Sequence, residues 1–303
     1  MTVRVVPEQF ATINAAIAAS APGDTIRILT GTFNESVTIP AGKDRLTIIG
    51  VWPRVTTITA TAGPVFTVNS NLVTIQNLTV QNAPNSPGIV LASNYNVIRN
   101  VEVRLCQRGI DIQNTSERNF IVNCNIHDNS AEGLNIAGPQ NLLYNNRITA
   151  NGGHNINLTT TSASNMLIKN FIRNSGRDGI QSFSSGDFIV DNFVRNSSQN
   201  GMFLASFFDI VYNNRIKQST LDGIDVVVAE QNRLISNTIK RSVNSGLSLS
   251  SSNVADENNI KSNRVGILML INSNNNAVRR NKLSNNTVNI NNLGANNVID
   301  END

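Results

Sequence analysis

Short segments in which apolar and polar residues alternate recur along most of the chain. Examples are VTIQNLTV (73–80), GIDIQN (109–114) and GLSLSS (246–251), which are rich in aliphatic and β-branched residues. Alternation of this kind predicts strands that bury one face. Asn, Gly and Ser separate the segments and predict turns between them. One stretch differs, because FATINAAIAAS (10–20) has apolar residues at helical spacing and predicts a short helix.

The strand segments belong to an internal repeat that two anchors define. The first anchor is Gly followed by Ile, Leu or Met, at Gly88, Gly109, Gly133, Gly179, Gly201, Gly223, Gly246 and Gly266. Asn155 takes the place of Gly between Gly133 and Gly179, and successive intervals are 20 to 24 residues. The second anchor is Asn followed two residues later by an aliphatic residue, at Asn146, Asn170, Asn192, Asn214, Asn237, Asn258 and Asn281. Two phased anchors indicate a solenoid.

A period of 20 to 24 residues suits a leucine-rich repeat or a β-helix. A leucine-rich repeat would show L-x-x-L-x-L-x-x-N and helical segments, whereas each repeat here holds three short strands, which indicates one coil of a parallel β-helix. Stacked coils would place equivalent Asn side chains about 4.8 Å apart, so that their amides hydrogen-bond along the stack. We predict one all-β domain over 1–303, with residues 1–30 as the helical cap and first strand and about 11–12 coils over 31–303.

The N-terminal stretch also carries a family resemblance. FATINAAIAASAPGDTIRILTGTFNESVTI, followed by LTIIG at 46–50, resembles the opening of pectin-lyase-like right-handed β-helix proteins, which include pectin methylesterases. The G-I/L and N-x-I repeats from 88 to 290 are similar to the coils of that superfamily. The resemblance implies a single-stranded right-handed parallel β-helix. It implies no particular activity, because this fold carries many chemistries.

The catalytic motifs of the resembling enzymes have no matching counterpart. The Gln/Asp/Arg set of pectin methylesterases is not found in matching context, and the D-P-H motif of alginate epimerases is absent. The segments 221–225 and 215–217 look similar to the N-T-D and R-I-K motifs of polygalacturonases, but they occur in the wrong order, and D-D and G-H-G are missing. We interpret both segments as ordinary repeat residues.

Only 15% of the residues are charged, so the composition predicts a surface made mostly of amide and hydroxyl groups. The net charge of +3 is too small to indicate nucleic-acid binding, and no long Lys/Arg run is present. We expect Cys106 and Cys124 to be free thiols. The N-terminus MTVRVVPEQF lacks the apolar region of a signal peptide, and the chain has no run of about 18 apolar residues that would predict a membrane span.

The repeat turns sequence phase into rows of neighbouring side chains. The position three residues after the anchoring Asn is basic in five consecutive repeats, at Arg173, Arg195, Lys217, Lys240 and Lys261, with His127 and Thr149 in the two repeats before. Like charges at strand spacing repel one another unless they are counter-charged. The row therefore predicts a site for an anionic polymer such as an acidic polysaccharide. The alternative is a solvated stripe that neighbouring acids balance.

The rows that flank the Gly anchor predict a polar patch, which holds Arg108, Asp111, Glu132, His154, Asp178, Asp222 and Asp225. Hydrolysis of a glycosidic bond needs two carboxylates, and Glu132 and Asp178 lie two repeats apart, about 10 Å by strand spacing, with His154 between them. A lyase would instead need a base near a neutralised carboxylate, with Arg108 or Arg173 as the neutralising group. The alternative is that these residues are turn residues that serve solubility.

The missing motifs and the weakly charged surface favour a non-catalytic surface or structural β-helix that contacts glycans, on a cell, spore or virion surface. The alternative is a carbohydrate-active enzyme, a lyase, hydrolase or epimerase of an acidic polysaccharide, with Glu132, His154 and Asp178 as catalytic residues. The expected ligand-binding residues are Arg108, Asp111, Arg173, Arg195, Lys217, Lys240, Asp222 and Asp225. We expect no metal, cofactor or nucleic acid. The expected partners are a polysaccharide and a second copy of the chain at the uncapped C-terminal end.

Overall fold

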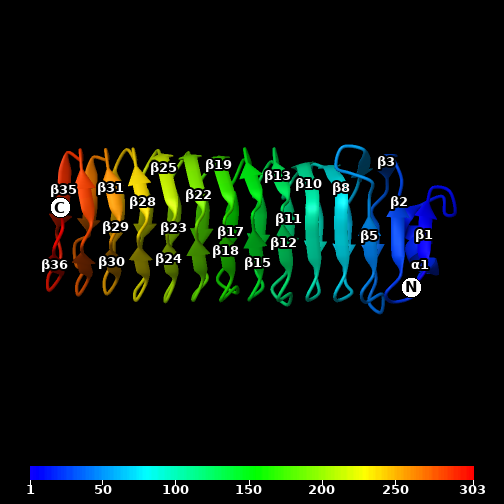
Figure 1. Cartoon of the computed structure of the whole chain (residues 1–303), viewed down its shortest axis with the longest axis horizontal. Helices are drawn as coiled ribbons and strands as arrows, with labels where there is room; N and C mark the ends of the chain where they lie inside the picture. Colours follow the sequence, from blue (N-terminus) through cyan, green and yellow to red (C-terminus); the bar gives the residue numbers. More distant parts are fainter. The chain divides into compact units, whose positions relative to one another are not determined.

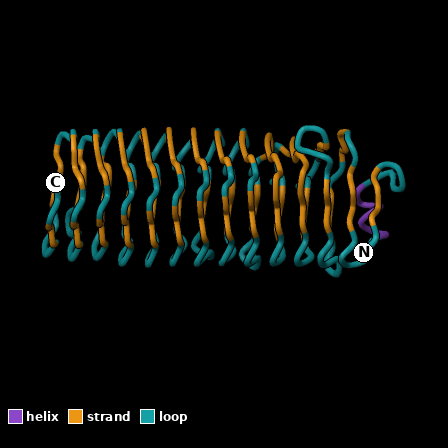
Figure 2. The backbone as a smooth tube through the Cα atoms, in the orientation of Figure 1, coloured by secondary structure: helices purple, strands orange, loops and turns teal.

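The computed structural model describes all 303 residues, which divide into two compact units, Met1–Gly152 and Gly153–Asp303. Each unit is a parallel β-helix, in which short strands from successive turns lie side by side (Figure 1). The only helix, α1 (Ile13–Ala19), lies near the N-terminus in the first unit (Figure 2). No helix combines the length and the apolar character needed to cross a membrane. The all-β, right-handed β-helix prediction is confirmed.

Three stacks of parallel strands build each unit, and we call them the first, second and third stack in the order in which a turn visits them. In the first unit, two long strands continue from the first stack into the second: β8 (Thr74–Ala83) and β10 (Val97–Cys106). The other first-stack strands are β1 (Val3–Val6), β2 (Thr25–Ile28), β5 (Thr47–Ile49), β12 (Phe120–Val122) and β15 (Leu142–Tyr144). The other second-stack strands are β3 (Gly31–Asn34), β6 (Thr56–Thr59), β13 (Asn125–His127) and β16 (Arg147–Thr149). The third stack contains β4 (Val37–Ile39), β7 (Phe66–Val68), β9 (Ile89–Leu91), β11 (Ile110–Ile112) and β14 (Leu134–Ile136).

The second unit repeats the three stacks with shorter strands. The first stack contains β18 (Met166–Ile168), β21 (Phe188–Val190), β24 (Ile210–Tyr212), β27 (Arg233–Ile235), β30 (Val254–Asp256), β33 (Ala277–Arg279) and β36 (Val298–Asp300). The second stack contains β19 (Phe171–Ser175), β22 (Phe193–Ser197), β25 (Arg215–Ser219), β28 (Thr238–Lys240), β31 (Asn259–Lys261) and β34 (Lys282–Ser284). The third stack contains β17 (Ile156–Leu158), β20 (Ile180–Ser182), β23 (Met202–Leu204), β26 (Ile224–Val226), β29 (Ser245–Leu249), β32 (Val265–Met269) and β35 (Val288–Asn292).

Both sequence anchors have the packing roles that stacking predicts. In the second unit the Nδ2 of Asn170 donates to Oδ1 of Asn192, and Asn192 donates in the same way to Asn214, each over 3.0 Å. The Gly anchor is required by close approach, because a Cβ on Gly179 would lie 2.6 Å from the carbonyl oxygen of Gly201. The aliphatic residues two positions after the Asn anchor, such as Ile172, point inward and are fully buried. The period thus fixes which side chains face the core and which face solvent.

The number of turns and the two ends sharpen the prediction. The solenoid has about 13 turns, more than the 11–12 predicted, because β1 precedes the helix and already pairs with β2. Thr12 caps the helix N-terminus by accepting a hydrogen bond from the backbone of Ala15. At the other end, β36 leaves Val298 and Ile299 49% and 42% exposed. Self-association through that end stays a prediction. Cys106 and Cys124 are free and buried, as expected.

Candidate functional site

The predicted basic row exists in the second unit. The strands β19, β22, β25, β28 and β31 pair in parallel, and their register places Arg173, Arg195, Lys217, Lys240 and Lys261 next to one another in that order. Each follows a buried aliphatic residue, so its own side chain lies on the outer face of the second stack. We call these five residues the basic row. Its alignment is confirmed, while its role as a ligand site stays a prediction.

No acid of the protein balances the basic row. None of its five members forms an ion pair, and the Nε of Arg195 donates instead to Oε1 of Gln218 over 2.7 Å. A hydrogen bond with Lys261, partial burial and the neighbouring cations lower the pKa of Lys240 to about 8. Burial and the charges of Arg215 and Arg195 also lower the pKa of Lys217. The row therefore carries a positive potential that an external anion would relieve.

The surface around the basic row is hollowed and partly aromatic. A hollow of about 430 Å³ extends along it and is lined by Arg195, Lys217, Gln218, Lys240, Arg241, Lys261, Ser262 and Asn285. Beside the row, the rings of Phe171 and Phe193 stack with centroids 5.3 Å apart. The Nζ of Lys217 lies 5.9 Å from the Phe193 ring centroid. Aromatic rings thus hold part of the positive charge in place without neutralising it.

The predicted polar patch is divided between the two units, and each half has internal partners. In the first unit, Nε of Arg108 lies 2.9 Å from Oε2 of Glu132, and Nη1 of Arg108 lies 3.8 Å from Oδ1 of Asp111. Asp111 also accepts hydrogen bonds from Asn135 over 2.7 Å and from Gln113 over 2.9 Å. Arg108 therefore neutralises both acids of this half within the protein.

In the second unit, the predicted catalytic His154 and Asp178 are buried in a turn. Nδ1 of His154 lies 3.2 Å from Oδ2 of Asp178, and the two residues are only 4% and 3% exposed. Oδ1 of Asp178 accepts the backbone N–H of Asn200 over 2.8 Å. Asn200 does the same for Asp222, and Asp222 for Ser245. These acids therefore serve a structural ladder of side chain to backbone bonds.

Asp225 is the member of the patch that keeps a chemical signature. It lies on the outer face of β26 and is half-buried. Burial, with the charges of Asp222 and Asp178, raises the pKa of Asp225 to about 6. Burial also raises the pKa of Asp222. Carboxyl groups with raised pKa values are candidates for general acids.

Sequence reasoning missed a buried charge network in the first unit. The carboxylate of Glu102 on β10 has three partners: Nη2 of Arg54 at 2.8 Å, Nε2 of His127 at 3.2 Å and Oγ1 of Thr79, which donates to it over 3.1 Å. Burial alone would raise the pKa of Glu102, but these hydrogen bonds and the charge of Arg54 lower it to about 2. Its position between the buried Val101 and Val103 was the available signal. A charged residue flanked by core residues on a predicted strand usually has a partner.

Comparisons with known families agree with this architecture. Residues 64–206 match the family described as a right-handed β-helix region, and residues 155–302 match the family described as periplasmic copper-binding protein (NosD). Residues 155–302 contain neither His nor Cys. Copper sites in proteins use imidazole, thiolate and thioether ligands. The segment offers only the thioethers of Met166, Met202 and Met269, and the last two are fully buried in the apolar core, so it does not fit a copper centre. No curated protein matched the chain significantly.

Solved structures with the same fold have low sequence identity to the chain. The A-module of a mannuronan C-5 epimerase from Azotobacter vinelandii aligns with a TM-score of 0.79 at 17% identity, over 95% of this chain and 94% of that one. The catalytic domain of a GH87 α-1,3-glucanase aligns at 0.77 and 14% identity, and the Dettilon tailspike protein at 0.76 and 13%. The chain covers 64% and 66% of those two structures, each over 92% of its own length. The chain is therefore a right-handed parallel β-helix protein of the pectin-lyase-like fold.

Proposed function

We propose that the protein is a non-catalytic β-helix that binds an acidic polysaccharide through the basic row. The observation that carries the proposal is the in-register row of five cations, from Arg173 to Lys261, without an acidic partner. A charge on every turn, about 4.8 Å apart, suits a linear ligand that carries one carboxylate per sugar residue. Each further contact along such a polymer is intramolecular, so weak contacts add up to useful affinity.

One further feature supports binding over catalysis, and a second supports a polysaccharide as the ligand. From Gly88 to Gly266 the repeat intervals vary only from 20 to 24 residues, so no long loop walls a deep cleft beside the strands of these turns, which include the basic row. The similar structures include proteins named for mannuronan and for α-1,3-glucan, which supports a polysaccharide as the class of ligand. The positive charge of the basic row would favour an acidic polysaccharide over a neutral one.

The proposal can be tested by affinity electrophoresis in polygalacturonate, alginate and neutral dextran. We expect both uronate polymers to retard the protein, and high salt to weaken that retardation. Any retardation in dextran should not depend on salt. The double variant Arg195→Glu/Lys217→Glu should weaken uronate binding by on the order of a hundredfold, since each reversed charge contributes about 1 kcal/mol or more.

The matched control is Arg233→Glu/Arg279→Glu, which changes the net charge equally on exposed positions of the first stack of the same unit. It should keep most of the binding. Equal losses in the two double variants would mean that net charge alone attracts the polymer, and absence of binding by the unmodified protein would contradict the proposal.

A carbohydrate-active enzyme remains the second candidate, and Asp225 is the observation that favours it. The pKa of this outer-face carboxyl, near Asp222, is raised to about 6, toward the range of catalytic general acids, and about a tenth of the molecules keep the proton at pH 7. Incubation with uronate polymers, followed by assays for new reducing ends and unsaturated products, separates the candidates. Products that form with the unmodified protein and not with Asp225→Asn would replace the binding proposal by the enzymatic one.

A further inference from the structure

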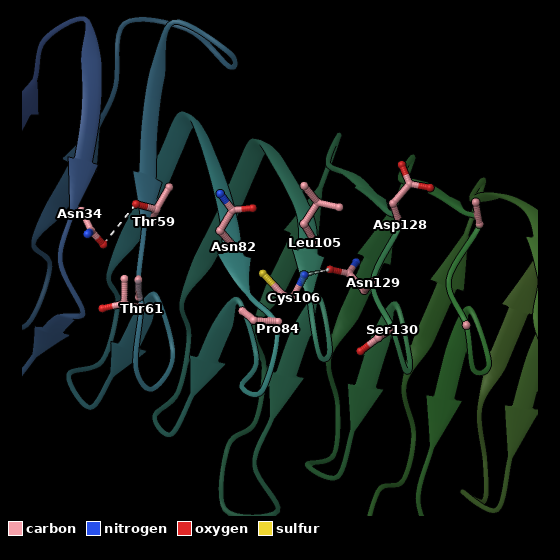
Figure 3. A pocket seen from close by; sticks show the side chains of 13 residues that line it. Asn34, Thr59, Thr61, Asn82, Pro84, Leu105, Cys106, Asp128, Asn129 and Ser130 are labelled. Atoms are coloured by element: carbon pink, nitrogen blue, oxygen red, sulfur yellow. Dashed lines mark hydrogen bonds between the residues drawn. The ribbon is translucent and has the colours of Figure 1, made fainter.

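A second surface feature, in the first unit, differs from the basic row in its chemistry. An open groove with a volume of about 990 Å³ follows the turns that leave the second stack (Figure 3). Pro84, Leu105 and the Sγ side of Cys106 provide apolar lining, and Leu105 is 45% exposed. Thr61, Asn82 and Ser130 lie along its edges, and their side chains form no hydrogen bond within the protein.

The groove is close to electrically neutral. No Lys or Arg lines it, and Asp128 is its only charged residue. The carboxylate of Asp128 lies 2.6 Å from Nδ1 of His127. A polyanion therefore finds no counter-charge here. Hydroxyl and amide groups beside an apolar floor match a ligand that carries neutral hydroxyls and has one apolar face.

The groove is also elongated. Its lining residues Asn34, Thr59, Asn82, Leu105, Asp128 and Ala150 come from six successive turns. Five intervals of about 4.8 Å give a length of roughly 24 Å along the stack. The bordering strands β8, β10 and β13 are already paired on both sides, so no free strand edge is available for a peptide to extend the sheet.

We propose that this groove binds a neutral oligosaccharide chain, lying along the stack, at a site independent of the basic row. The apolar faces of pyranose rings would pack on Leu105 and Pro84. The ring hydroxyls would exchange hydrogen bonds with Thr61, Asn82 and Ser130. This inference goes beyond the proposed function, because its ligand is uncharged and its residues belong to the first unit.

The test uses isothermal titration calorimetry of the full chain with cello-, xylo-, manno- and laminaripentaose. We expect at least one pentaose to bind, with an affinity that is the same in about 0.1 M and about 1 M salt. Leu105→Asn should weaken that binding by about tenfold or more, because it removes the apolar surface under the ring. Leu105 has a φ of 56°, a conformation that Asn tolerates better than Leu, so the variant should fold.

Leu72→Asn is the matched control, since Leu72 is 42% exposed, has a φ of 61° and lies outside the groove. It should leave binding unchanged. Ser130→Arg, at an exposed edge position, gives a second way to obstruct the groove without touching the core. The inference is overturned if no pentaose binds, or if binding survives both groove variants. The Arg195→Glu/Lys217→Glu protein should bind the pentaose normally, which separates this outcome from that of the basic row.

Discussion

The outer face of the second stack carries basic residues in both units, yet the two faces are built differently. In the first unit, Arg104 pairs in register with His127, and the neighbouring outward position on β10 is the buried acid Glu102. In the second unit, Arg173 pairs in register with Arg195, and the neighbouring positions are Phe171 and Phe193. The same winding thus gives an internally neutralised face in one unit and an unbalanced cationic face in the other. Charge balance, not alignment, separates a structural row from a candidate binding row.

Two acids of the second unit lie in the interior instead. In the first unit the turn before the first stack carries a ladder of amides, in which Asn119 donates to Asn141 over 3.2 Å. The equivalent positions in the second unit include Asp187 and Asp209, both fully buried. Burial raises the pKa of Asp187 to about 6, and burial with the charge of Asp187 raises that of Asp209 to about 7. A protonated carboxyl can donate a hydrogen bond as an amide does. Below these pKa values the two acids therefore add no negative charge to the second unit.

The largest expected effect tests this difference between the ladders. A carboxyl whose pKa is raised in the folded state stabilises the fold below its unfolded pKa, and that stability is lost as pH rises through about 6 to 7. The double variant Asp187→Asn/Asp209→Asn restores the amide ladder and should gain on the order of 3 kcal/mol at about pH 8, with little gain at about pH 4. Urea unfolding at the two pH values measures this.

The control for the ladder variant is Asp191→Asn, a half-exposed turn position that lies outside it. It should leave the pH dependence of stability intact. If the double variant lost stability with rising pH as steeply as the unmodified protein, the two acids would not be the origin of that dependence.

A smaller effect is expected from removing the acid that neutralises the first unit. Glu102→Gln should lower the free energy of unfolding by about 2 kcal/mol, because charged hydrogen bonds to a buried acid are replaced by weaker ones. The pKa of Glu102 is lowered, so its contribution is present above the unfolded pKa of about 4.3 and lost as pH falls through about 2. Thermal unfolding between about pH 2 and pH 7 should therefore show a smaller acid-induced loss for the variant.

Glu102→Gln also sharpens the comparison of the two faces. It leaves Arg54 without its acid and removes the only negative charge beside Arg104 on β10, which makes the first unit resemble the second. Introduced into the Arg195→Glu/Lys217→Glu protein, it should restore part of the uronate binding. Unchanged binding would mean that a basic residue without an acidic partner is not sufficient, and that the length of the row matters as well.

The sequence predicted what the repeat determines and missed what lies outside it. The period alone identified the register of Arg173 and Arg195, because every turn consumes nearly the same number of residues. It did not identify the partner of Glu102, because Arg54 lies 48 residues away in a turn that the repeat does not describe. It placed His154 and Asp178 on the ligand-facing surface, whereas both are buried. Phase specifies neighbours along the stack, but the local turn geometry decides whether a side chain points to solvent.

The smallest expected effect concerns the pH dependence of the basic row. The pKa of Lys240 is about 8 in the free protein, so this residue loses its charge between about pH 7 and pH 9, while uronate carboxylates stay ionised. Uronate binding should therefore weaken severalfold across this range. Lys240→Arg keeps its charge throughout and should flatten the profile without reducing affinity at pH 7. An equally steep profile for this variant would show that Lys240 does not contact the polymer. A flattened pH profile would show that the crowding of cations around Lys240 affects binding directly. The first unit avoids such crowding through Glu102.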